Sequence, residues 1–433
     1  MQEHTNTDTL TLPNGAQPQS RLGAAFADPV LRILLTATAI SATSRGVFFA
    51  LTVLYFTLVV GLSAFEIAVI LTASSAVGVV TSLLGGVLAD RISARNLLLG
   101  FVAIEGIALL SYTFANSFVS ALAIACVVTG ANRGANTVRA AIIGRAFIGS
   151  LRVGARAMLR TVQNLGVALG GAAASIPLLI GTPDAYLVSM AIAAALTLAS
   201  TLAILRLPRR VGATPRRGEG RTPLVGRSPW RDSRYLALSI FSALFGIQFG
   251  LAEIGLPLWI VHHTNAPAVA LSVVLIINTA LVIALQIPFS RGTQDIRKAG
   301  NVLALAGVCM AVACAIYAAT SGVSPTLAFV LLALAMVAHT LGEVFSSAGG
   351  WGLSYELADP HRIGEYQGMF AMAFSVGSML TPMILTVTVI DNGTAGWAAL
   401  GVLFLGSALV MWAISRTYLR RTEPRFVSDP AAG

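Results

Sequence analysis

The sequence predicts an all-α integral membrane protein in which twelve transmembrane helices form two pseudo-symmetric bundles of six. Three observations support this fold class. Hydrophobic residues make up 56% of the chain, charged residues only 11%, and the mean hydropathy is +0.80, whereas a soluble domain carries roughly 25% charged residues. Uncharged runs of the roughly 20 residues needed to cross a bilayer recur along the whole sequence. Lys and Arg are concentrated in every second connection between these runs.

Turn residues and charges mark the ends of the predicted spans. The spans of the first half are 33–59, 65–89, 95–115, 118–144, 156–182 and 185–206, and those of the second half are 235–261, 268–291, 299–320, 325–357, 364–390 and 394–416. A faint internal repeat supports two equivalent halves, because the segments that begin at Arg152 and Arg362 share their spacing of Arg and Gly. Six spans in each half, joined by a polar linker, indicate a parallel repeat.

The predicted domains are an N-terminal tail (1–32), an N-terminal six-helix bundle (33–206), an arginine-rich linker (207–234), a C-terminal six-helix bundle (235–416) and a C-terminal tail (417–433). The positive-inside rule places both tails and the linker in the cytoplasm. The pI near 10.2 therefore reflects topology, and we expect no nucleic-acid partner. Only one of the 28 basic residues is a lysine, a bias typical of a GC-rich genome. We expect a monomer in a bacterial cell membrane.

The connection between the second and third spans carries the most specific motif. The stretch "GGVLADRISAR" places an acid and two arginines directly after a long uncharged run. It resembles the motif Gly-x-x-x-Asp-Arg-x-Gly-x-Arg-Arg of the major facilitator superfamily. The matching residues here are Gly86, Asp90, Arg91 and Arg95, while Ser93 replaces the second glycine and Asn96 the last basic residue. The resemblance covers about residues 30–420 and implies the major facilitator fold and a transport function.

The same motif predicts a gate on the cytoplasmic side, formed by Gly86, Asp90, Arg91 and Arg95. Glycine permits close approach of two helices. Asp90 would lie near the positive dipole end of the eleventh span, and the two arginines would pair with acids or phosphates. Such contacts would hold the halves closed on this side. In the alternative interpretation the arginines only anchor the topology, although an anchor would not need an acid.

Seven ionisable residues are the candidates for positions deep inside the predicted spans, where a charge at the helix centre costs about 2.5–3.5 kcal/mol on insertion scales. The first half contains mainly cations and the second half the acids: Arg45, Glu105, Arg133 and Arg139, then Glu253, His339 and Glu343. The family resemblance implies that spans 1, 4, 7 and 10 line the central cavity, and six of the seven lie on these spans. Arg139 could instead reach the cytoplasmic interface by snorkelling.

This distribution predicts ion pairs across the cavity, with Arg45 or Arg133 facing Glu253 or Glu343. Protonation of the acid would release its arginine, which is the chemistry that proton coupling requires. The candidates for proton coupling are Glu253, Glu343, His339 and Glu105. A static buried ion pair is the alternative for the first two, a local hydrogen bond for Glu105, and simple hydrogen bonding for His339, which shares a helix face with Glu343.

Polar and aromatic residues on the same spans are candidates for the substrate cavity, although such aromatic residues often simply pack. The predicted lining comprises Arg45, Arg133, Phe49, Phe249, Trp259, Asn278 and Phe345. The fifth span resembles the glycine-rich signature of the family's antiporters only in part. It has Gly166, Gly170 and Gly171, but its proline is delayed to Pro177, so this span favours export only moderately.

Three classes of function follow. The first is proton-coupled export of a small lipophilic compound, such as a drug or secondary metabolite. The alternative is an uptake transporter or facilitator for a nutrient or organic anion. A membrane enzyme or receptor lacks support, because the sequence has no nucleotide-binding loop, HExxH or nucleophile motif. We therefore expect no enzymatic activity, no cofactor and no metal, with the proton gradient as the energy source.

Overall fold

The structure is a computed structural model that describes residues 28–208, 211, 226–267 and 269–422. These residues form helices, short connections and an isolated β-bridge between Thr264 and Ser321. Most of the N-terminal tail, most of the linker and the end of the C-terminal tail, for which we predict cytoplasmic positions, lie outside the described residues.

The helices of the first half agree with the predicted spans to within a few residues, apart from the early start of the fifth span. They are α2 (Pro29–Leu58), α3 (Ala64–Arg91), α4 (Ala94–Ser111), α5 (Phe118–Ala146), α6 (Ser150–Ala173), the short α7 (Ser175–Ile180) and α8 (Pro183–Ile204). Helix α2 begins four residues before the predicted boundary because Asp28 caps it, accepting a hydrogen bond from the Val30 amide at 2.7 Å. Ser63 and Glu66 form a capping box that starts α3.

The second half differs from the prediction in its seventh span, which is interrupted. It consists of α9 (Ser233–Phe245), α10 (Ile247–Gly250), the π-helical turn η4 (Leu251–Gly255) and α11 (Leu256–His263). Within this turn the amide of Leu256 bonds to the carbonyl of Leu251, five residues back. Pro257 follows directly and has no amide hydrogen to donate to the carbonyl four residues earlier. The proline therefore accounts for the irregular backbone at this point.

The remaining helices are α12 (Val269–Ser290), α13 (Ile296–Ala318), α14 (Pro325–Glu356), α15 (Ile363–Leu385), the π-helical turn η6 (Thr386–Ile390) and α16 (Asp391–Thr422). Eleven helical stretches among the described residues are long and apolar enough to cross a membrane. The last, Pro360–Arg420, has 61 residues, about three times the length that one crossing requires. Its backbone leaves the helical region at Gly393, where φ is 54°.

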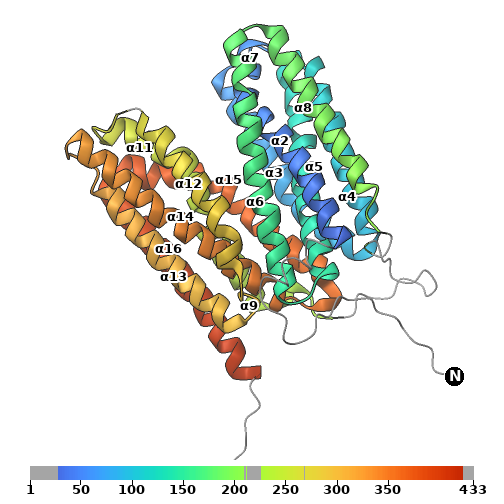
Figure 1. Cartoon of the computed structure of the whole chain (residues 1–433), viewed down its shortest axis with the longest axis vertical. Coiled ribbons are helices and arrows are strands. Elements are labelled where there is room, and N and C mark those ends of the chain that lie inside the picture. Colours follow the sequence, from blue (N-terminus) through green and yellow to red (C-terminus); the bar gives the residue numbers. More distant parts are fainter. Residues whose placement is uncertain (1–27, 209–210, 212–225, 268, 423–433) are drawn as a thin grey trace, which may run out of the picture.

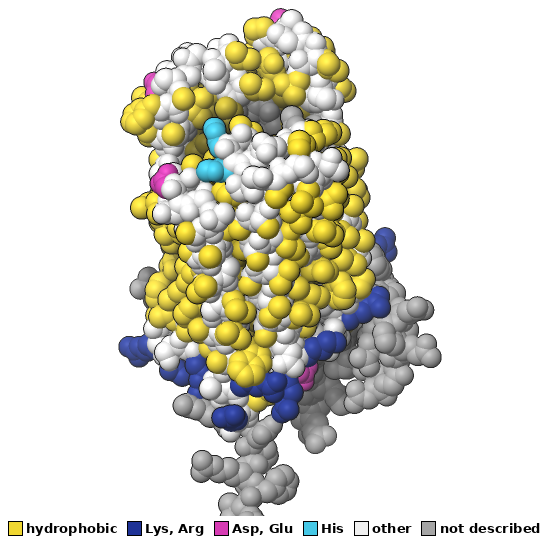
Figure 2. Space-filling view, turned by 90° about the vertical axis from the view of Figure 1, so that its left-hand side faces the viewer, with side chains coloured by type: hydrophobic (Ala, Val, Ile, Leu, Met, Phe, Trp, Pro, Cys, Tyr) yellow, Lys and Arg dark blue, Asp and Glu magenta, His cyan; other side chains and the backbone are white. Residues whose placement is uncertain are grey.

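The helices form two groups that follow the chain order (Figure 1). Helices α2–α8 lie together, and α9–α16 form the second group; the groups meet at one end of the molecule and diverge toward the end that carries α7 and α11. In Figure 2 hydrophobic side chains cover the flank of the molecule, and Lys and Arg gather at one end of it. We call this the arginine-rich end. It is the end at which the two groups meet.

Candidate functional site

Helices α3 and α15 join the two halves through direct backbone contact. A Cβ atom added to Gly86 of α3 would lie 2.2 Å from the carbonyl oxygen of Gly364 and 2.6 Å from the Cα of Gly368. No side chain fits between the helices at Gly86, which is the close approach that glycine permits. One turn further into the membrane, the hydroxyls of Ser82 and Ser375 lie 3.2 Å apart. The glycine of the predicted gate is therefore a contact point between the halves.

Asp90 stabilises the contact between α3 and α15 at the arginine-rich end. Its carboxylate accepts hydrogen bonds from the amides of Gly364 (2.9 Å) and Glu365 (2.7 Å) in the first turn of α15. It also forms an ion pair with Arg145, in the last turn of α5. A carboxylate at a helix N-terminus is stabilised by free amides and by the helix dipole. The structure thus places Asp90 at the start of the eleventh predicted span.

Neither arginine of the motif forms an ion pair with a described acid, and this part of the predicted gate needs correction. Arg91 is exposed, and Arg95 donates to the carbonyl of Leu205 at 2.5 Å within the first half. Arg145 provides the positive charge at Asp90 instead. Its position follows from the packing of α5 on α3, where Gly134 faces Gly85. The sequence does not indicate Arg145 as a partner of Asp90, because the two residues are 55 positions apart and meet only when α5 packs on α3.

We expect Asp90→Asn to weaken closure at the arginine-rich end. The amide loses the ion pair and donates where a carboxylate accepts, which would cost about 2 kcal/mol, or roughly a 30-fold shift in the opening equilibrium. A cysteine introduced at Ala140, whose carbonyl accepts from Tyr355 across the halves, should then react faster with an impermeant thiol reagent applied from this end. Equal labelling rates in wild type and variant would leave Asp90 without a role in closure.

A second cross-half contact is an ion pair near the middle of the molecule. The guanidinium of Arg160, on α6, lies 2.6 Å from the carboxylate of Glu343, on α14. Glu343 is buried and also accepts from Asn278 at 2.9 Å, while Arg160 lies over the ring of Phe249 at 4.7 Å. A single titratable acid is therefore held by both halves of the protein.

An arginine of the first half does pair with an acid of the second half, as predicted, but the arginine is Arg160 and not Arg45 or Arg133. Among the described residues, neither Arg45 nor Arg133 forms an ion pair with Glu253 or Glu343. Arg160 takes this place because α6 packs on α14 and α12 across the interface. The sequence does contain a signal for Arg160. This arginine lies several residues inside the fifth predicted span, too far from the loop for the positive-inside rule alone to explain it.

Glu253 and His339 have very different surroundings. Glu253 is exposed, lies in the π-helical turn η4, and is close enough to Glu343 and Arg160 for their charges to act on it. π-Helical turns often occur at functional sites. His339 is fully buried, with Nδ1 3.4 Å from the hydroxyl of Tyr317. No hydrogen bond joins the described side chains of His339 and Glu343, so they do not form a direct relay.

Glu105 belongs to a polar chain inside the first half. Its carboxylate accepts from Asn132 at 2.7 Å, Asn132 accepts from Asn136 at 3.1 Å, and Asn136 accepts from Arg139 at 2.7 Å. Arg139 is only 7% exposed, so its guanidinium does not reach the interface by snorkelling. The local hydrogen bond expected for Glu105 is present, as one link of this longer chain.

The structure corrects two of the predicted cavity residues. Trp259 is 1% exposed, donates to the hydroxyl of Thr320 at 2.9 Å and packs edge-on against Trp397. Phe345 is also buried and packs against Phe289 of α12. Both residues fill the interior of the second half, because each finds aromatic partners on neighbouring helices. Phe49, in contrast, is 65% exposed, and Phe249 contacts Arg160 as described above.

Trp259→Phe tests this correction. The substitution removes a buried hydrogen bond and part of an aromatic contact, so we expect it to destabilise the protein by about 1–2 kcal/mol. The midpoint of thermal unfolding in detergent should fall, while the KM for transport should stay within a factor of two of wild type, an estimate of about 0.4 kcal/mol. A large rise in KM with unchanged stability would show that Trp259 contacts the substrate, as the sequence predicts.

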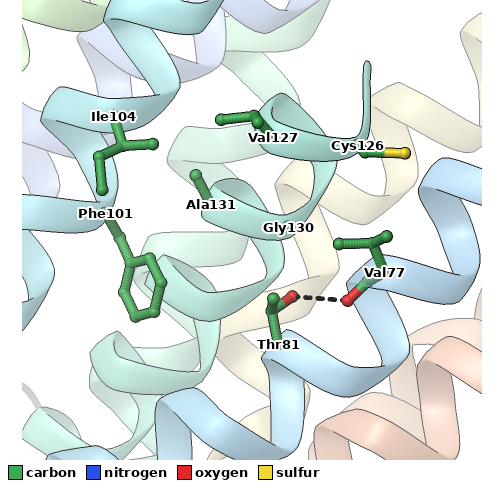
Figure 3. Close-up of a pocket in the computed structure, with 8 residues that line it drawn as sticks. All are labelled: Val77, Thr81, Phe101, Ile104, Cys126, Val127, Gly130 and Ala131. Atoms are coloured by element: carbon green, nitrogen blue, oxygen red, sulfur yellow. Dashed lines mark hydrogen bonds between the residues drawn. The ribbon is translucent and has the colours of Figure 1, made fainter. Parts of the chain in front are cut away.

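An apolar cavity of about 200 Å³ lies apart from these charged contacts, between α3, α4 and α5. Figure 3 shows that its lining comes from three helices of the first half and that the drawn polar contact is internal to α3. Its walls are formed by Val77, Thr81, Phe101, Ile104, Cys126, Val127, Gly130 and Ala131. With apolar walls and no charged group, this cavity does not contribute to the site.

The fold and the site together define a multi-pass membrane protein whose halves meet through titratable and glycine contacts, as in a transporter. The family model of the Major Facilitator Superfamily matches residues 34–382. The chain therefore belongs to this superfamily, whose members are transporters and not enzymes. No curated protein matches the sequence.

Several solved transporters share the fold. A bacterial homologue of the iron transporter ferroportin, in an outward-facing state, has a TM-score of 0.70 at 14% identity and covers 90% of this chain and 100% of its own. The transporter FucP in its outward conformation has a TM-score of 0.69 at 14% identity, covering 91% and 99%. The human organic anion transporter MFSD10 has a TM-score of 0.64 at 14% identity, covering 91% and 100%.

Proposed function

We propose that this chain is a secondary active transporter that exports a small, mainly lipophilic organic compound in exchange for protons. The observation that carries the proposal is the ion pair between Arg160 and Glu343, which joins the two halves through a titratable acid. The structural neighbours include an organic anion transporter and a homologue of an iron transporter, so the fold alone does not define the substrate.

The proposed topology has twelve spans in two bundles, with the long helical stretch Pro360–Arg420 crossing twice and turning at Gly393. Both termini and the linker lie in the cytoplasm of a bacterial cell, and the protein acts as a monomer. Two observations support this orientation: basic side chains gather at one end of the molecule (Figure 2), and such residues are enriched on the cytoplasmic side of membrane proteins.

With this orientation, the described contacts between the halves close the cytoplasmic side. The proteins that share the fold include two outward-facing structures, which agrees with the divergence of the two groups at the opposite end in Figure 1. A proton that enters from outside meets the exposed Glu253 before the buried Glu343. Protonation of Glu343 weakens its attraction to Arg160, so the cytoplasmic side can open and release the proton there.

The substrate is exported when the protein returns from the state open to the cytoplasm to the outward-facing state. With the substrate bound from the cytoplasm and Glu343 deprotonated, the ion pair reforms and favours closure on the cytoplasmic side. The substrate then leaves toward the outside, where protons are more abundant. Each state is favoured by a differential interaction, as a population shift requires. The glycine and Asp90 contacts stabilise the same outward-facing state as the ion pair.

The test uses everted membrane vesicles that contain the protein, a pH-sensitive dye and a panel of lipophilic compounds. We expect at least one compound to dissipate an imposed proton gradient in vesicles with the wild-type protein but not in vesicles with Glu343→Gln. A gradient that no transported compound dissipates would exclude proton exchange. The second candidate is an uptake transporter or facilitator for a nutrient or organic anion. The buried arginines of the first half suit an anion in either direction of transport.

A further inference from the structure

The first half contains more buried positive charge than its acids neutralise. Arg45 and Arg139 are 9% and 7% exposed, and Arg133 is half-buried. The described ion pairs include none of these three arginines. Among the described residues, the acid whose charge acts on this group is Glu105, which is 4% exposed and accepts from Asn132. Three cations therefore share one acid at a depth where each isolated charge is costly.

The charge of Arg45 also acts on the other two guanidinium groups. Arg45 lies within electrostatic range of both Arg133 and Arg139, so the like charges repel. The Nε atoms of Arg45 and Arg139 are buried and have no hydrogen-bond partner. A buried donor of a charged group that has no hydrogen-bond partner lowers the stability of the fold, because it loses its bond to water and gains none in return. Glu105 is thus the single acid for three cations among the described residues, and the cluster has excess positive charge that a bound anion could neutralise.

Arg133 connects the cluster to the space between the halves. Its Cγ lies 3.0 Å from the position of a Cβ on Gly78 of α3. Ser82, one turn along the same face of α3, is the residue that meets Ser375 of the second half. Arg133 is thus one helical turn from a contact between the halves, on the side where the halves diverge. Arg160 differs, because Glu343 and Phe249 already occupy its guanidinium.

We propose that Arg45 and Arg133, supported by Arg139, bind the negatively charged group of the substrate, which is an organic anion. This inference rests on the proposed transport function and names the substrate class. Guanidinium groups bind carboxylate, sulfonate and phosphate oxygens through paired hydrogen bonds. The bound anion supplies the partner that the Nε of Arg45 lacks and screens the repulsion between the arginines. The exported compound therefore combines an apolar body with an acidic group.

The test compares three probes with one scaffold: naphthalene-2-carboxylate, its neutral amide and 2-naphthylmethylammonium. Purified full-length protein in lipid nanodiscs is heated with each probe up to its solubility limit, since a ligand that binds the native state raises the unfolding midpoint. We expect the carboxylate to stabilise the protein at a concentration at least tenfold lower than either other probe. Arg133→Gln should abolish this preference, whereas Arg133→Lys should retain part of it.

Stability without a ligand provides a second readout. Because Arg45 repels both Arg133 and Arg139, Arg45→Gln should raise the unfolding midpoint of the ligand-free protein, whereas loss of a structural ion pair would lower it. Any of three results would overturn the proposal: equal or stronger stabilisation by the amide or the amine, no stabilisation by the carboxylate, or a lower midpoint for Arg45→Gln. Glu343→Gln should keep the carboxylate preference, so failure of proton coupling and failure of the anion site give different results.

Discussion

Replacement of Gly86 by alanine should reduce transport at least tenfold, through a cost of about 3 kcal/mol to the closed contact between α3 and α15. The new methyl group would lie 2.2 Å from the carbonyl oxygen of Gly364 and 2.6 Å from the Cα of Gly368. These are backbone atoms, so no side-chain rotation can relieve the clash. The helices must separate, and the state that is closed at the arginine-rich end loses population relative to states that are open there.

The measurement combines initial transport rates with thiol labelling of a cysteine at Ala140 from the arginine-rich side. Gly100→Ala is a matched control, because Gly100 lies within α4 and a Cβ there would meet no atom within 4 Å. The control should transport like wild type, since alanine is the better helix former. If Gly86→Ala also transported and labelled like wild type, the glycine contact would have no part in the transport cycle.

Glu343→Gln should abolish accumulation against a gradient while leaving passive exchange of substrate intact. Glutamine keeps the shape of the side chain and its hydrogen bond from Asn278, but it neither titrates nor attracts Arg160 as a charge. In proteoliposomes, counterflow of labelled substrate should therefore continue, and an imposed pH gradient should no longer drive net movement. Glu253→Gln should slow the proton-driven rate without abolishing it, because Glu253 makes no ion pair among the described residues.

Glu66→Gln provides the acid-to-amide control, since Glu66 caps α3 away from the interface and glutamine can serve in the same capping box. A further variant, Arg160→Gln, should reproduce the loss of coupling by removing the other partner. Wild-type proton-driven transport by the Glu343→Gln protein would show that Glu343 does not carry the proton. Glu105 would then be the next carboxyl group to test, and a facilitator would become the better hypothesis.

The sequence was most informative where a single helix and its solvent decide the structure. Composition and the length of uncharged runs indicate membrane-spanning helices, because a backbone in lipid must satisfy its hydrogen bonds within each span. The motif at Gly86 and Asp90 identifies a helix end whose glycine and acid meet another helix, and the structure shows that helix to be α15. Cations in the first half and acids in the second also follow from residue order alone.

The partners of these residues depend on tertiary packing. Asp90 and Glu343 pair with Arg145 and Arg160, and not with the arginines that the sequence predicts. The sequence shows which arginines are near a membrane surface, but it does not show which helix each one faces. Trp259 and Phe345 look the same in sequence whether they line a cavity or fill a core. Their positions are set by the rotation of each helix about its axis, which results from the packing of all neighbouring helices. The π-helical turn that contains Glu253 has a local cause instead, because Pro257 cannot donate to the carbonyl four residues earlier.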